Sequence, residues 1–287
     1  MRQEIIALYD EYTHKGMDRR LFMERLAALA GGMAAAAALV PLLEANYAHG
    51  AMTEPDDPSL TTERVSVPTD SGELAGYLAK PADASQPLPA IIVVHENRGL
   101  NPHIEDVARR AAKEGFLVLA PDFLSSLGGT PDDPDAAREM FGGLDMDQVT
   151  AQARAAIDWL AAREDSNGNV GIVGFCWGGG VVGRVAVAAP ELDAGVVFYG
   201  PAPPSEEVAS IQAPLLLHYA GLDERIGAGV PDFEEALEAA GKTYTLHMYE
   251  GVNHAFHNDT SEARYDEEAA TLAWERTIAF FKETLAG

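Results

Sequence analysis

From about residue 60 to the end of the chain, short apolar runs alternate with segments of helical periodicity, and this alternation limits the fold more than any other feature. The apolar runs cover residues 89–95, 116–122, 169–175, 194–200, 213–221 and 244–250. The helical patterns cover residues 103–114, 147–163, 179–189, 231–240 and 262–284. Buried strands that alternate with helices predict a mostly parallel central sheet with helices on both faces.

The start and the middle of this region add two expectations. Residues 62–68 and 73–79 flank a turn at 70–72, which predicts an N-terminal antiparallel hairpin. The stretch 123–146 is rich in Gly, Pro and Asp and predicts an irregular segment. Since it leaves the C-terminal end of a strand, we expect it to cover a site there. The whole of residues 61–287 is predicted to be one α/β domain.

The chain is strongly acidic, with a formal net charge of −25 over 287 residues. A field of that sign repels nucleic acid and anionic lipid, so we expect neither as a partner. One cysteine excludes an intrachain disulfide, and no Cys/His spacing typical of a zinc site is present. No nucleotide or flavin motif appears either, so we expect no metal and no cofactor. The sequence leaves the oligomeric state open.

Residues 1–48 have the pattern of an export leader. DRRLFMER at 18–25 contains the paired arginines Arg19 and Arg20, and a weakly apolar, alanine-rich run follows at 26–43. This order resembles a twin-arginine signal. We expect the export machinery to read residues 1–48, with cleavage near Ala48, a polar linker at 49–60, a periplasmic product and no stable membrane insertion after processing. The alternative is an ordinary helix at the start of a cytoplasmic protein.

The only cysteine lies in GIVGFCWGGG (171–180), between a predicted strand and a predicted helix. The frame from Gly174 through Cys176 to Gly178 is G-x-C-x-G, the nucleophile elbow with cysteine in place of serine. Glycines two residues to either side let the strand and the helix approach closely. The helix that begins after Cys176 favours a thiolate and a nearby oxyanion. The alternative is a buried structural cysteine on a glycine-rich turn.

A nucleophile on this kind of turn needs a base and a group that orients the base. Asp223 follows the strand 213–221, and His254 follows the strand 244–250. Both therefore lie at the same edge of the sheet as Cys176, in the chain order nucleophile, acid, histidine. His254 would accept the thiol proton or pair with the thiolate, and Asp223 would orient the imidazole. Glu224 is the rival of Asp223, and His218 and His257 are the rivals of His254.

Four stretches together resemble the dienelactone hydrolase family, also called carboxymethylenebutenolidases: GFCWGGG, AGLDERI, GVNHAFHN and HENRGLNPHIEDVARR. The resemblance implies the α/β-hydrolase fold and a triad of Cys176, Asp223 and His254. It also implies that Glu96 helps to activate the thiol, and that the backbone N–H groups of Trp177 and Asn97 form the oxyanion hole.

Two positions depart from the family pattern. Lactone-cleaving members bind a substrate carboxylate with arginines, where this chain has FLSSLGG (123–129) and Asn258. Arg98 is the remaining candidate for substrate binding. We therefore expect a cysteine hydrolase that cleaves a neutral carboxylic ester or lactone, a small molecule, through an acyl-enzyme. The alternatives are a thioesterase or peptidase on the same fold, and an exported binding protein without turnover.

Overall fold

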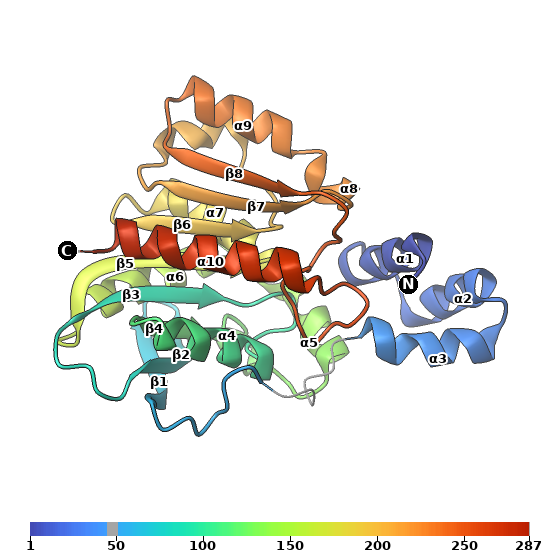
Figure 1. Cartoon of the computed structure of the whole chain (residues 1–287), viewed down its shortest axis with the longest axis horizontal. Coiled ribbons are helices and arrows are strands. Elements are labelled where there is room, and N and C mark those ends of the chain that lie inside the picture. Colours follow the sequence, from blue (N-terminus) through green and yellow to red (C-terminus); the bar gives the residue numbers. More distant parts are fainter. Residues whose placement is uncertain (45–50, 287) are drawn as a thin grey trace.

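The computed structural model describes residues 1–44 and 51–286, and its centre is one eight-stranded sheet (Figure 1). The strands follow the order β1-β2-β4-β3-β5-β6-β7-β8. β1 pairs antiparallel with β2, β2 pairs antiparallel with β4, and the other pairs are parallel. The strands are β1 (Leu60–Thr69), β2 (Gly72–Pro81), β3 (Leu88–Val94), β4 (Leu117–Pro121), β5 (Ser166–Phe175), β6 (Ala194–Phe198), β7 (Leu215–Ala220) and β8 (Tyr244–Tyr249).

Helices cover both faces of the sheet. One hydrophobic core lies between the sheet and α6, α7 and α9, and the other lies between the sheet and α4 and α10. These helices are α4 (Pro102–Lys113), α6 (Met146–Ala161), α7 (Trp177–Ala188), α9 (Val230–Ala239) and α10 (Glu267–Thr284). Each predicted strand is present and the antiparallel hairpin is β1–β2, so the predicted α/β fold is confirmed.

Two boundaries differ from the sequence prediction. The last helix begins at Glu267 and not at 262, because the Asp266 side chain caps it by accepting a hydrogen bond from Ala269 N at 3.0 Å. The stretch 123–146 was predicted to be irregular, but it contains α5 (Pro134–Met140). Asp133 caps α5 and proline occupies its first turn, two local signals of a helix start. The remaining short helix, α8 (Glu224–Gly227), follows β7.

Residues 1–44 form three helices at the carboxyl edge of the sheet (Figure 1). They are α1 (Gln3–His14), α2 (Arg19–Ala30) and α3 (Met33–Leu43). Their apolar side chains build a third hydrophobic core, in which Phe22 and Leu26 are buried. Within the described residues, no single helix is long and apolar enough to span a membrane. Only α2 and α3 taken together meet that criterion, and they are bent by 110°.

The paired arginines of the predicted leader lie in the first turn of α2. Arg19 forms ion pairs with Glu44 at 3.2 Å and with Asp135 of α5 at 2.7 Å, and Arg20 pairs with Glu24 at 3.0 Å. The expected cleavage near Ala48 and the first two linker residues lie outside the described residues. Export through this segment stays a prediction.

Candidate active site

Cys176 lies on a tight turn between β5 and α7. Its backbone has φ 55° and ψ −113°, a conformation that L-residues rarely adopt. A Cβ atom at Gly174 would lie 2.1 Å from the carbonyl oxygen of Gly178, and one at Gly178 would lie 2.5 Å from the carbonyl oxygen of Val94. Only glycine therefore fits at both positions. The turn holds the sulfur at the carboxyl edge of the sheet, where its side chain is 5% exposed.

Asp223 and His254 meet at the same edge. Asp223 follows β7 and caps α8 by accepting a hydrogen bond from Ile226 N at 3.1 Å. Its second carboxylate oxygen lies 2.5 Å from Nδ1 of His254, which follows β8. An ionised carboxylate only accepts hydrogen bonds, so Nδ1 of His254 carries the hydrogen and Nε2 points elsewhere.

The electrostatics of this pair follow from its surroundings. Burial alone would lower the pKa of His254, but the charge of a Cys176 thiolate and the Asp223 carboxylate raise that pKa to about 10. Burial opposes ionisation of Asp223, yet its bond to His254 leaves the pKa of the carboxyl below its ordinary value. His254 is therefore an imidazolium whenever the sulfur is a thiolate.

The rival residues lie elsewhere. Glu224 is exposed on α8. His218 is buried in β7, where its ring nitrogens contact Tyr249 and Thr277. The ring of His257 stacks on Phe175 at a centroid distance of 5.0 Å. Of the acid and histidine candidates from the sequence, the structure brings together Asp223 and His254.

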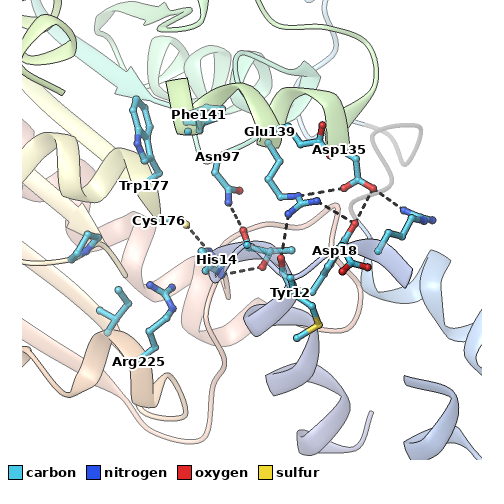
Figure 2. Close-up of a pocket in the computed structure, with 18 of the residues that line it drawn as sticks. Tyr12, His14, Asp18, Asn97, Asp135, Glu139, Phe141, Cys176, Trp177 and Arg225 are labelled. Atoms are coloured by element: carbon cyan, nitrogen blue, oxygen red, sulfur yellow. Dashed lines mark hydrogen bonds and ion pairs between the residues drawn. The ribbon is translucent and has the colours of Figure 1, made fainter. Parts of the chain in front are cut away.

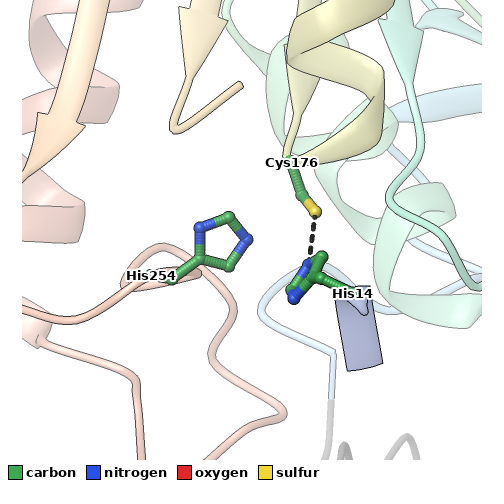
Figure 3. Close-up of side chains that lie close together, drawn as sticks. All are labelled: His14, Cys176 and His254. Atoms are coloured by element: carbon green, nitrogen blue, oxygen red, sulfur yellow. Dashed lines mark hydrogen bonds between the residues drawn. The ribbon is translucent and has the colours of Figure 1, made fainter. Parts of the chain in front are cut away.

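A second histidine contacts the thiol, and sequence reasoning missed it. Nε2 of His14, at the end of α1, lies 3.2 Å from Sγ of Cys176 (Figure 3). The rings of His14 and His254 lie 4.8 Å apart and nearly perpendicular. Nε2 of His254 has no hydrogen-bond partner within the described chain. No local pattern links His14 to Cys176, which lies 162 residues further along the chain.

The same three residues have the geometry of a metal-binding group. One ligand atom from each of His14, Cys176 and His254 lies within 4.8 Å of the other two. Two imidazole nitrogens and a thiolate are donors that suit Zn²⁺. Among the described residues, this is the one group of three or more His, Cys, Asp or Glu side chains whose ligand atoms lie this close together.

The two residues expected to form the oxyanion hole flank Cys176. Trp177 opens α7, and Asn97 lies in the loop after β3. Within the described part of the chain, the backbone N–H groups of Trp177 and Asn97 donate no hydrogen bond. The indole of Trp177 stacks on His95 at 5.3 Å, and the Asn97 side chain donates to the carbonyl oxygen of Thr13 at 3.0 Å. Both residues are thus anchored through their side chains.

The sequence model of the dienelactone hydrolase family matches residues 74–285. This chain belongs to that family. The resemblance seen in the sequence is therefore confirmed. A second model, described as YqhI-like, matches residues 1–31, the part of the chain that contains α1.

Individual relatives agree with the family assignment. An Escherichia coli O157:H7 protein named "Putative carboxymethylenebutenolidase" is 32% identical over 244 residues, 80% of this chain and 89% of that protein. The "Putative hydrolase fragment YghX" of E. coli strain K12 is 53% identical over 112 residues, 38% of this chain and 96% of the fragment. The crystal structure of a "Putative Dienelactone Hydrolase" from Klebsiella pneumoniae shares 32% identity, with a TM-score of 0.72, over 78% of this chain and 99% of that one.

Glu96 makes a contact that the dienelactone hydrolase resemblance did not predict. It is buried after β3 and accepts a hydrogen bond from the Asn258 side chain at 2.7 Å. Asn258 is the position at which an arginine was expected from the family pattern. Its oxygen in turn accepts from Thr260, so the amide is oriented by its own loop. The carboxylate is thus held in place beside the thiol site by Asn258.

Arg98, the candidate for substrate binding, has protein partners. Its guanidinium donates to the carbonyl oxygen of Pro134 at 2.8 Å and pairs with Asp135 at 3.4 Å. Arg98 therefore ties the loop after β3 to α5. It does so in a half-buried position, next to the small cavity that Glu96, Cys176 and Arg98 line together.

A pocket of about 990 Å³ opens beside the thiol (Figure 2). The α/β domain (residues 61–287) contributes Cys176, Trp177, Asn97 and Arg225 to its lining, and α1 contributes Tyr12 and His14. Residues of the stretch 123–146 complete the wall, among them Phe141 and Glu139. That stretch contributes to the site, in agreement with the prediction that it covers one.

Proposed function

We propose that this dienelactone hydrolase relative is a cysteine hydrolase that cleaves a carboxylic ester or lactone through a thioester acyl-enzyme. The observation that carries the proposal is the position of the only cysteine. Cys176 lies on a strained turn that excludes any Cβ at both flanking glycines, within reach of a carboxylate–imidazole pair at the same edge of the sheet. Strained backbone held by its surroundings is typical of a catalytic nucleophile.

The reaction has two halves. In acylation, Sγ forms a bond to the carbonyl carbon, the carbonyl electron pair moves to oxygen, and the thiol proton passes to an imidazole. The unpaired N–H groups of Trp177 and Asn97 stabilise the oxyanion, and the C–O bond then breaks as the leaving oxygen receives the proton. In deacylation, His254 accepts a proton from water as the water oxygen forms a bond to the thioester carbonyl carbon. The C–S bond then breaks, the carboxylic acid leaves, and the sulfur recovers the proton from His254 as the free thiol.

Two contacts favour a neutral acyl group. Arg98 is paired with Asp135, and Asn258 is an uncharged amide, so neither offers a free positive charge to a substrate carboxylate. Three arginines line the pocket: Arg19 and Arg138, which both pair with Asp135, and Arg225, which is exposed. An exposed guanidinium gains little from a carboxylate in water. We therefore expect a neutral ester to react faster than its dicarboxylate analogue.

The test is hydrolysis of p-nitrophenyl acetate by the full chain, before and after treatment with iodoacetamide. We expect turnover that alkylation abolishes, one acetyl group on Cys176 by mass spectrometry, and no turnover by Cys176→Ala. Acetyl thioesters and acylated peptides are assayed in parallel, and faster turnover of either would replace the ester assignment. Wild-type rates in Cys176→Ala, or no thiol-dependent turnover of any substrate, would refute the proposal and favour a binding protein.

A further inference from the structure

We propose that the N-terminal helices are a permanent part of the active site, and that His14 is the catalytic residue that takes the thiol proton when Cys176 attacks. This inference rests on the proposed function, because it assigns a role within the same hydrolytic reaction. It adds a residue that lies outside the segment 74–285 matched by the dienelactone hydrolase family.

The hydrogen bonds of His14 determine which of its nitrogens faces the sulfur as an acceptor. Nδ1 lies 2.9 Å from the carbonyl oxygen of Asp10, and a carbonyl only accepts, so Nδ1 carries the hydrogen. The hydroxyl of Thr13, 3.0 Å from Nδ1, donates to the carbonyl oxygen of Tyr9 and can accept from the same N–H. Nε2 therefore presents a lone pair to Sγ at 3.2 Å.

The surroundings keep His14 neutral. Removal from water is the main cause that holds the pKa of His14 well below its ordinary value, and the positive charge of Arg225 adds to it. A neutral imidazole with a hydrogen on Nδ1 has a bare Nε2, which accepts the S–H of the resting thiol. The direction of the hydrogen bond is thus from Cys176 to His14.

The two histidines then have different tasks. As the C–S bond forms, the thiol proton moves along its existing hydrogen bond to Nε2 of His14, which passes it to the leaving oxygen. Among the described residues, no hydrogen bond occupies Nε2 of His254 at the geometry found here, although the Cys176 sulfur lies close enough to influence its pKa. In the acyl-enzyme the sulfur carries no charge, so the thiolate contribution that raises the pKa of His254 is gone. His254 is then free to accept a proton from the attacking water.

Contacts on either side of His14 hold it in place. The hydroxyl of Tyr12 donates to Asp135 at 3.0 Å, and Arg138 stacks over the Tyr12 ring at 4.5 Å. The carbonyl oxygen of Thr13 accepts the bond from Asn97 described above. These partners come from α5 and from the loop after β3, which both line the site (Figure 2).

Further along α1, Asp10 pairs with Arg264 at 3.4 Å, and Gln3 donates to Asn253 at 2.6 Å. The helix is therefore attached along its length and not only at its last residue. Since His14 and Cys176 both line the 990 Å³ pocket, a substrate can reach the sulfur without displacement of α1.

This role conflicts with removal of the leader. Cleavage near Ala48 would take His14 away from the thiol together with all three helices. We therefore expect the active enzyme to retain residues 1–44, whether or not the chain is exported. Intact-mass measurement of the purified active protein tests this point, and an active form that lacks these residues would contradict it.

The kinetic experiment measures the pre-steady-state burst of p-nitrophenol and the slower steady-state rate in the full chain. His14→Ala should slow the burst by about 10²–10⁴-fold, the usual contribution of a general base. His14→Gln should slow it similarly, because its amide oxygen can accept the S–H hydrogen bond but cannot take the proton. His254→Ala should keep the burst and then stop, with acetyl-enzyme detected by mass spectrometry.

Arg20→Ala is the matched control, because it removes only the exposed ion pair with Glu24 inside α2 and should leave the burst unchanged. Thermal melting verifies that each variant is folded. A wild-type burst in His14→Ala or in His14→Gln would overturn the assignment, and so would loss of the burst in His254→Ala alone. Turnover that survives Cys176→Ala would instead refute the proposed function itself.

Discussion

The glycine before the nucleophile allows a quantitative test of the elbow. In Gly174→Ala, the new Cβ would lie 2.1 Å from the carbonyl oxygen and 2.4 Å from the carbonyl carbon of Gly178. The first contact is 1.3 Å shorter than the 3.4 Å at which ordinary van der Waals contact begins. Both partners are backbone atoms, so no side chain can rotate away. The strand and the start of α7 must separate by about that distance.

Such a separation acts on stability and on rate. Overpacking of a core typically costs about 1–3 kcal/mol. A displacement of about 1 Å at a reacting group can lower the rate about 100-fold. We therefore expect Gly174→Ala to lower the free energy of unfolding by about 1–3 kcal/mol, and to lower kcat/KM for p-nitrophenyl acetate by about 100-fold or more. Urea unfolding and steady-state kinetics measure the two effects separately.

The control is Gly227→Ala, because a Cβ at Gly227 would meet nothing within 4 Å. It should leave both the free energy of unfolding and kcat/KM unchanged. If Gly174→Ala turned over substrate like the wild type, the steric argument for the elbow would be wrong. If Gly227→Ala were as damaged as Gly174→Ala, the loss would reflect alanine substitution in general and not the contact.

Three further predictions concern the acid, the leader and the buried glutamate. Asp223→Asn should lower steady-state turnover by about 10⁴-fold, because an amide favours the wrong tautomer of His254. Glu224→Gln should have little effect. If Glu224→Gln were the more damaging of the two, Glu224 and not Asp223 would orient the histidine. The double variant Arg19→Lys, Arg20→Lys should keep the full-length protein in the cytoplasm. If cell fractionation also found the wild type in the cytoplasm, the export prediction would be wrong. Glu96→Gln should slow acylation and shift alkylation of the thiol by iodoacetamide to lower pH, since one negative charge near the sulfur is lost. If the burst rate and the pH dependence of alkylation both stayed unchanged, the role of Glu96 would be structural.

Much of the catalytic domain was predictable because its signals are local. A strand of the sheet is a short apolar run, and the strand-to-helix turn around Cys176 requires glycines at set positions. Parallel strands bring their carboxyl ends to one edge of a sheet, so the residues that follow β5, β7 and β8 lie along that common edge, and β7 and β8 are neighbours. The proximity of Asp223 and His254 follows from that rule and needs no knowledge of side-chain packing.

Other features depended on packing between distant segments. α5 was missed because a seven-residue helix has too few turns to show a clear periodicity, although Asp133 and Pro134 signal its start. The bond between Glu96 and Asn258 joins two loops 162 residues apart, and no spacing along the chain predicts it. These contacts form only once the sheet has placed both loops at its edge.

By itself, the sequence determined the parallel sheet, the cysteine elbow and the order of the residues that follow the strands, since each of these is encoded within about ten neighbouring residues. The sequence also suggested an export leader in residues 1–48, because it contains paired arginines before an apolar run. That pattern is the same in a leader and in a helix that packs on the folded domain. Only the tertiary structure decided where residues 1–44 lie. The hydrogen bond from Tyr12 to Asp135 and the ion pair between Arg19 and Asp135 hold α1 and α2 against the α/β domain, and that docking brings His14 to within 3.2 Å of the thiol.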